Sequence, residues 1–283
     1  MPSPDDRELE TLIRARYPII YIVSWEEKRV EDALKAITAE RGKRLFFWTV
    51  TQGMVTSPTA SDNATRQPMA ALDFVLNSND PAVFLLKDFH SFLTDFEIVR
   101  RLRDLTYALK TSYKTLVILA PALKLPPELE KEITVVDYDL PTKSDLDRLL
   151  ENIIRSVRGN AQLNTDLSPE ERHRVLDAAL GLTANEAENV FARSLVEKRR
   201  FDVDVILSEK AQIIRKSGIL EYYRAPDSMN DVGGLDLLKG WMKKRTRAFS
   251  EKARAFGLPA PKGILLLGVQ GCGKSLCCKA VAS

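Results

Sequence analysis

The first half of the chain alternates short apolar runs with stretches of helical periodicity. Near-continuous apolar runs of the kind seen in buried strands occupy residues 17–23, 45–50, 82–86, 116–119 and 133–138. Apolar residues between these runs recur every three or four positions, which predicts helices; examples are Val30, Leu34 and Ile37. The polar segment 51–67 is predicted as a loop. This alternation predicts an α/β fold with a mostly parallel sheet and helices on both faces.

The strand signals stop after Pro141, and a purely helical pattern follows. Helices are predicted at residues 145–157, 169–180, 185–198 and 202–216. Around Pro226 the pattern changes again, to a helix containing Trp241 and then an apolar strand at 263–267. We therefore expect an α/β core at 1–141, a helical unit at 142–222 and the start of a second module at 223–283.

Composition and charge exclude several classes of protein. Lys plus Arg number 42 and Asp plus Glu 39, so a strongly basic nucleic-acid coat protein is excluded. The basic clusters at 197–200 and 243–247 are interpreted as solvated helix faces, with contact to nucleic acid, an acidic partner or headgroups as the alternative. No apolar run approaches the roughly 20 residues of a membrane helix, and the acidic N-terminus resembles no signal or transit peptide. The three cysteines lie together near the C-terminus, which indicates a reducing, intracellular compartment.

One motif carries chemistry. Residues 268–275 match G-x-x-x-x-G-K-[ST] in full, between an apolar strand pattern and a helical one. Glycine permits the tight backbone, and the N–H groups of residues 270–275 are expected to form an anion-binding nest at a helix N-terminus. Lys274 is expected to reach the β- and γ-phosphates, and the Ser275 hydroxyl to bind Mg²⁺. Cys272 within the loop is interpreted as a tolerated small residue, with a redox gate as the alternative.

The sequence around this motif resembles the opening of the AAA module of AAA+ ATPases. The resemblance rests on residues 231–236, the helix after them and residues 261–268, and it covers about the last 55 residues. It implies ATP and Mg²⁺ as cofactors, with Lys274 as the catalytic residue and Ser275 as the metal ligand. The implied nucleotide-binding residues are Asp231, Val232, Gly233, Gly268, Val269, Gln270, Gly271, Cys272, Gly273, Lys274, Ser275 and Leu276. Val269 stands where the family usually has proline.

The N-terminal region resembles a degenerate copy of the same module. Residues 83–88 are similar to a Walker B strand, but Phe89 stands where the water-activating Glu belongs. After the first strand there is no phosphate loop, and Ser24 and Glu27 have capping-box spacing. We expect this cap and its negative charge to exclude phosphate. The helices that follow resemble an AAA lid, and a generic doubly wound domain is the alternative.

The whole arrangement resembles the tandem AAA proteins encoded as conserved open reading frames in cyanobacterial and plastid genomes. This implies a bacterial cytoplasmic or plastid-stromal protein, a ring-shaped homo-oligomer and an unidentified protein target; nucleic acid is not indicated. The chain is interpreted as an N-terminal fragment that does not hydrolyse ATP alone, whereas its parent couples hydrolysis to remodelling or regulation of a macromolecular partner. The alternatives are a nucleotide-gated scaffold without turnover and a P-loop kinase or GTPase.

Overall fold

The structure is a computed structural model, and it describes residues 3–57, 59–158, 162–216, 232–249, 253, 256–259 and 262–282. The chain divides into two compact units, residues 1–210 and 211–283. In the part of the chain that is described, no helix is long and apolar enough to cross a membrane.

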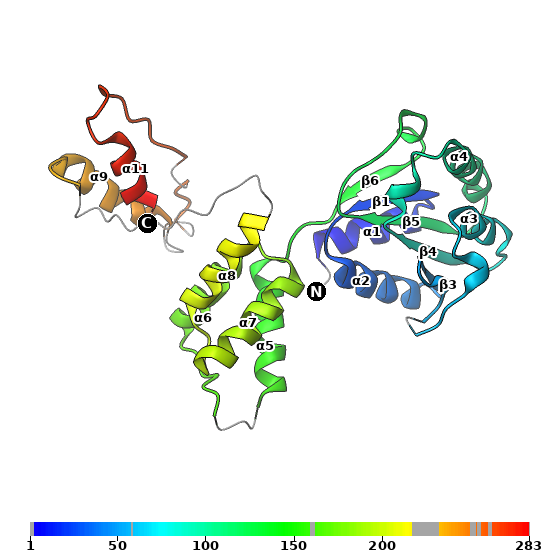
Figure 1. Ribbon diagram of the computed structural model, residues 1–283, viewed down its shortest axis with the longest axis horizontal. Helices are drawn as coiled ribbons and strands as arrows, with labels where there is room; N and C mark the ends of the chain where they lie inside the picture. Colours follow the sequence, from blue (N-terminus) through cyan, green and yellow to red (C-terminus); the bar gives the residue numbers. More distant parts are fainter. Residues whose placement is uncertain are drawn as a thin grey trace. The chain divides into compact units, whose positions relative to one another are not determined.

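A six-stranded sheet with the order β3-β2-β4-β5-β1-β6 forms the centre of the first unit (Figure 1). Neighbouring strands pair in parallel, except that β3 is antiparallel to β2 at one edge. The strands are β1 (Ile19–Val23), β2 (Arg44–Thr49), β3 (Gly53–Val55), β4 (Ala82–Lys87), β5 (Thr115–Ala120) and β6 (Thr134–Asp137).

Helices cover both faces of this sheet, as Figure 1 shows. One face packs against α1 (Pro4–Arg14) and α2 (Glu27–Glu40), the other against α3 (Pro68–Asn77) and α4 (Phe96–Lys110). Successive β1 residues point to opposite faces, and both faces are buried: Tyr21 packs with α3 and α4, and Ile20 with α1 and α2. This double burial explains the near-continuous apolar runs in the sequence, and the predicted α/β class is confirmed.

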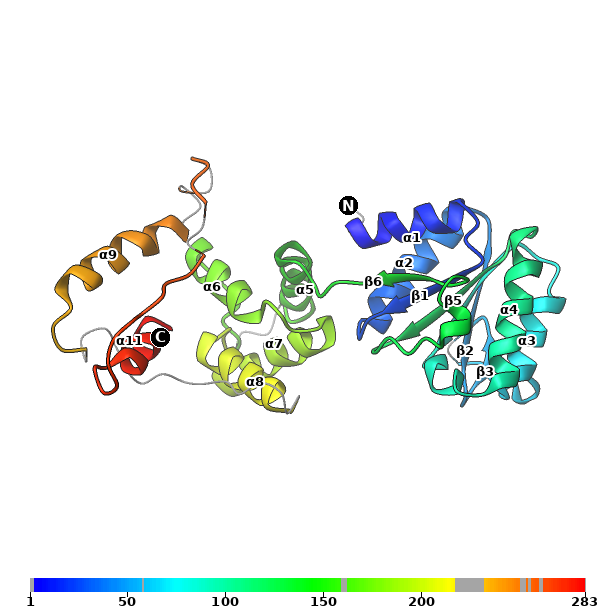
Figure 2. The ribbon, with the colours of Figure 1, turned by 90° about the horizontal axis from the view of Figure 1, so that it is seen from above.

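Four helices follow the sheet, and we call them the lid (Figure 2). The last of them extends past residue 210, where the first unit ends. They are α5 (Lys143–Ser156), α6 (Pro169–Ala179), α7 (Ala184–Lys198) and α8 (Val203–Lys216). Thr142, Ser168 and Thr183 begin the first three, each in a capping box with the acidic residue three positions later. Fully buried Leu150 and Phe191 belong to the apolar faces that hold the lid together.

Two elements of the first unit were not expected. The segment 51–67, predicted as a loop, contains β3, whose Met54 N–H donates to the Thr65 hydroxyl at 2.7 Å. The Trp48 indole donates to the Thr65 carbonyl oxygen, also at 2.7 Å. These polar side chains fix an edge strand too short to show periodicity. Helix α1 begins at a capping box between Ser3 and Asp6, a signal that the acidic N-terminus contains.

The second unit contains α9 (Asp236–Thr246) and α11 (Lys274–Ala282). The buried strand expected at residues 263–267 is not formed: among the described residues it has no strand partner. Its Leu265 and Leu267 side chains are 80% and 85% exposed. A β-strand is stabilised by hydrogen bonds to neighbouring strands, so an apolar run without neighbours does not form one.

Candidate nucleotide-binding site

The predicted phosphate loop leads directly into α11. Lys274 is the first residue of this helix, so Ser275 and Leu276 lie in its first turn. Gly271 and Gly273 have φ angles of +84° and +79°, which glycine adopts without the penalty that a side chain imposes. The first N–H groups of a helix have no partner within it, so this end of α11 offers donors to an anion.

The Lys274 ammonium lies against the same loop. Its Nζ donates to the carbonyl oxygens of Gly268 at 2.8 Å and Val269 at 2.6 Å, and it lies 3.6 Å from the Cys272 sulfur. The Cys272 sulfur also approaches Gly268 so closely that a Cβ there would lie 2.6 Å from it. Positive charge and N–H groups without a partner inside α11 are thus brought together, the combination that binds phosphate.

The structure describes only some of the nucleotide-binding residues expected before α9. Asp231 lies outside the described residues. Val232 is buried, and its carbonyl oxygen accepts a hydrogen bond from the Lys239 ammonium, whereas Gly233 is exposed. Within the described ranges, no hydrogen bond joins Val232 or Gly233 to the phosphate loop. Their contact with a nucleotide therefore stays a prediction.

A cavity of about 520 Å³ in the second unit lies beside the phosphate loop's helix. It is lined by one side of α9, the segment 262–266 and the Cys277, Cys278 and Val281 positions of α11. None of the glycine-loop residues borders it, so this apolar cavity is distinct from the candidate phosphate site.

The corresponding place in the first unit is the connection from β1 to α2. It contains three residues, Ser24, Trp25 and Glu26, because β1 ends at Val23 and α2 begins at Glu27. The phosphate loop has six residues, 268–273, before its helix begins. A connection half as long does not have enough backbone to surround a phosphate group.

The charge at this place is also reversed. Glu27 is the first residue of α2, the position that Lys274 holds in α11. Its carboxylate pairs with Lys87 at 3.1 Å, and Lys87 also pairs with Glu31. Burial lowers the pKa of Lys87, but the hydrogen bonds to Glu31 and Glu27 outweigh it and leave the pKa raised. The positive charge is therefore already neutralised by two carboxylates.

The capping box predicted between Ser24 and Glu27 is wrong. Glu26 is the residue before the helix, and its side chain makes no capping bond. The Ser24 hydroxyl instead accepts from the Glu26 N–H at 3.1 Å and donates to the Tyr138 carbonyl oxygen at 3.0 Å. The helix starts later than the spacing suggested, so Ser24 ties the connection to the end of β6.

The two residues after the strand that resembles Walker B do not form a catalytic pair of carboxylates. Asp88 follows β4 with φ of +55°, and its side chain is 63% exposed. Phe89 is fully buried, with its ring centroid 5.2 Å from that of Trp48 and 5.7 Å from that of Phe92. The place of the missing Glu is thus part of the apolar core.

Sequence reasoning missed two residues that connect this region to the lid. The Glu26 side chain accepts a hydrogen bond from the N–H of Ala184, 158 positions away, and Arg29 pairs with Asp145 of α5. The adjacent residues Glu26 and Glu27 at the start of α2 were the only signal in the sequence, and nothing local identified the distant partners.

Comparison with known proteins gives the family. The model for the N-terminal domain of SpoVK-like AAA ATPases matches residues 5–138, and the model for their second domain matches residues 144–217. The AAA domain-containing protein ycf46 of Trieres chinensis is 38% identical over 282 residues, covering 98% of this chain and 56% of that protein. The ycf46 protein of Guillardia theta is 36% identical, covering 98% of this chain and 55% of that protein.

These matches show that the chain belongs to the AAA+ ATPase family. Within the family it is of the ycf46 type, and it spans about half the length of the relatives that it matches. A chain of the E. coli MS115-1 HORMA:CdnC:Trip13 complex aligns with a TM-score of 0.48 and 12% identity, over 77% of this chain and 78% of that one.

Proposed function

We propose that this chain is part of an ATPase that binds ATP and Mg²⁺ at residues 268–275. In the full-length protein, ATP hydrolysis is coupled to remodelling or regulation of a macromolecular partner. In this proposal the first unit binds no nucleotide and serves as a rigid domain of the ATPase. The observation that supports this proposal most directly is the loop geometry. Two glycines with positive φ are followed by Lys274 at the first position of α11.

The residues at the loop fit a nucleotide triphosphate with its metal. Lys274 already points at the loop backbone, so phosphate oxygens there would replace the two carbonyl oxygens as its acceptors. The Ser275 hydroxyl is exposed and is the kind of oxygen ligand that Mg²⁺ prefers. The metal would neutralise charge on the phosphates, while the loop N–H groups orient them.

The same proposal includes the oligomeric state, the protein target and the cellular location. A ring-shaped homo-oligomer, an unidentified protein target and a bacterial cytoplasmic or plastid-stromal location follow from the resemblance to tandem AAA proteins. Family membership and the absence of a spanning helix in the described part are compatible with each of these.

A nucleotide-gated scaffold without turnover is the second candidate. It is favoured by the composition of the first unit, in which Phe89 fills the place of a catalytic carboxylate and the phosphate loop is missing. Under this hypothesis the first unit binds a partner, and the phosphate loop acts as a switch.

The test is ATP binding and turnover by the full-length protein, wild type beside Lys274→Ala. Loss of a charge-assisted contact worth about 1.5–3 kcal/mol predicts a roughly 10- to 150-fold weaker affinity. Lys279→Ala, in the last turn of the same helix, is the matched control and should bind as wild type. Turnover that disappears with Lys274 supports the ATPase, and binding without turnover supports the scaffold. Equal binding by wild type and Lys274→Ala would refute both.

A further inference from the structure

Glu26 carries the least accessible carboxylate next to the first unit's lost phosphate site. The residue is 4% exposed, and its side chain lies between the carboxyl end of β1 and the lid. Burying a carboxylate is costly unless it is paired and hydrogen-bonded, so its partners define what it does.

The main partner is the N-terminus of lid helix α7. The Glu26 Oε1 accepts a hydrogen bond from the N–H of Ala184, the first residue of α7, at 2.8 Å. The capping box between Thr183 and Glu186 occupies the N–H groups of those two residues and leaves that of Ala184 free for Glu26. Anions bind favourably at helix N-termini, and here the anion belongs to the chain itself.

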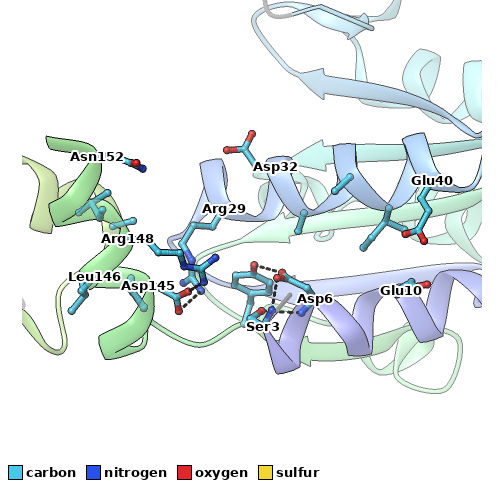
Figure 3. Close-up of a pocket in the computed structure, with 17 residues that line it drawn as sticks. Ser3, Asp6, Glu10, Arg29, Asp32, Glu40, Asp145, Leu146, Arg148 and Asn152 are labelled. Atoms are coloured by element: carbon cyan, nitrogen blue, oxygen red, sulfur yellow. Dashed lines mark hydrogen bonds and ion pairs between the residues drawn. The ribbon is translucent and has the colours of Figure 1, made fainter. Parts of the chain in front are cut away.

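Arg29, one turn further along α2, links the Glu26 carboxylate to α5 and to the segment between β6 and α5. Its guanidinium lies 3.7 Å from Glu26 and 3.8 Å from Asp145 of α5, and it donates to the Asp139 carbonyl oxygen at 2.8 Å. It also lies 5.1 Å from the ring centroid of Tyr138. Figure 3 shows Arg29 reaching from α2 toward Asp145. Both residues line a pocket of about 710 Å³.

We propose that Glu26 and Arg29 act as a built-in substitute for a nucleotide, fastening the lid to the sheet independently of ATP. Glu26 takes the place of a phosphate at the α7 N-terminus, and Arg29 bridges α2, the end of β6 and α5. A nucleotide dissociates, but these side chains do not, so the first unit keeps one arrangement of sheet and lid throughout any cycle of the second unit.

Hydrogen–deuterium exchange of the full-length protein tests this inference. In Glu26→Ala, exchange should rise roughly tenfold or more in both the first turn of α7 and the first turn of α5. Helix α7 loses its hydrogen bond to Glu26, and α5 loses the carboxylate that holds Arg29 beside Asp145. Asp32→Ala is the matched control, because Asp32 is an exposed acid on α2 that pairs with Lys35 of the same helix. It should leave both segments unchanged.

Two further measurements distinguish a contact that holds the whole lid against the sheet from a local hydrogen bond. Glu26→Gln keeps an acceptor oxygen and should give an intermediate increase, which also covers the case in which the alanine variant fails to fold. Addition of Mg-ATP to Lys274→Ala, in which nucleotide binding by the second unit is weakened, should change exchange nowhere in residues 24–29 or 183–187. Three results would each overturn the proposal. The first is increased exchange confined to α7, and the second is equal exchange in Glu26→Ala and Asp32→Ala. The third is ATP-dependent protection of these residues in Lys274→Ala.

Discussion

Replacing Phe89 by glutamate restores the acid that the strand resembling Walker B lacks, and we expect it to damage the fold without creating activity. Phe89 is fully buried and packs edge-on against Trp48 and at a tilt against Phe92. Losing a buried phenylalanine costs about 3–5 kcal/mol through lost burial and the cavity left behind. The new carboxyl group adds the cost of burying a polar group without a partner.

A loss of about 4 kcal/mol corresponds to a fall in Tm of roughly 8–16 °C for a domain of this size. Thermal and urea unfolding of the chain, followed by near-UV circular dichroism, measures it. Phe96→Glu is the matched control, since Phe96 is 79% exposed and its replacement should change stability by less than about 0.5 kcal/mol. A Phe89→Glu variant within about 1 kcal/mol of wild type would refute the assignment of Phe89 to the core.

Two other predictions concern stability. Gly53→Ala should lower the free energy of unfolding by more than about 2 kcal/mol in urea titrations, because a Cβ would lie 1.9 Å from a backbone oxygen. Gly42→Ala, at a positive φ in open space, should cost only about 1 kcal/mol; equal losses would contradict the steric argument. Burial raises the pKa of Glu26 above 4.5, with Arg29 opposing the shift and Glu186 adding to it. The free energy of unfolding of wild type relative to Glu26→Gln should therefore fall as the pH rises from 4.5 through the raised pKa, and a pH-independent difference would disprove it.

Patterns that repeat within one element could be predicted from the sequence. The β1 and β4 runs are near-continuously apolar because both faces of the sheet are covered, and the periodicity at 185–198 predicted α7 to within one residue of its start. The phosphate loop was visible because its chemistry lies in eight consecutive residues.

Features that depend on distant partners could not be predicted in this way. The Ser24 capping box failed because α2 begins only at Glu27, and the Ser24 hydroxyl donates to the Tyr138 carbonyl oxygen 114 positions away. The strand at 263–267 failed for the converse reason: its apolar residues were correctly recognised, but ladder formation requires neighbours that a local pattern does not contain.

The three-residue connection between β1 and α2 has an evolutionary consequence. Substitutions at Ser24, Trp25 and Glu26 change side chains, whereas a phosphate loop of six residues requires additional backbone. Point mutations alone therefore cannot turn this connection into a six-residue phosphate loop; an in-frame insertion would also be required. The difference between the two connections is therefore one of backbone length, which later substitutions in these three codons leave unchanged.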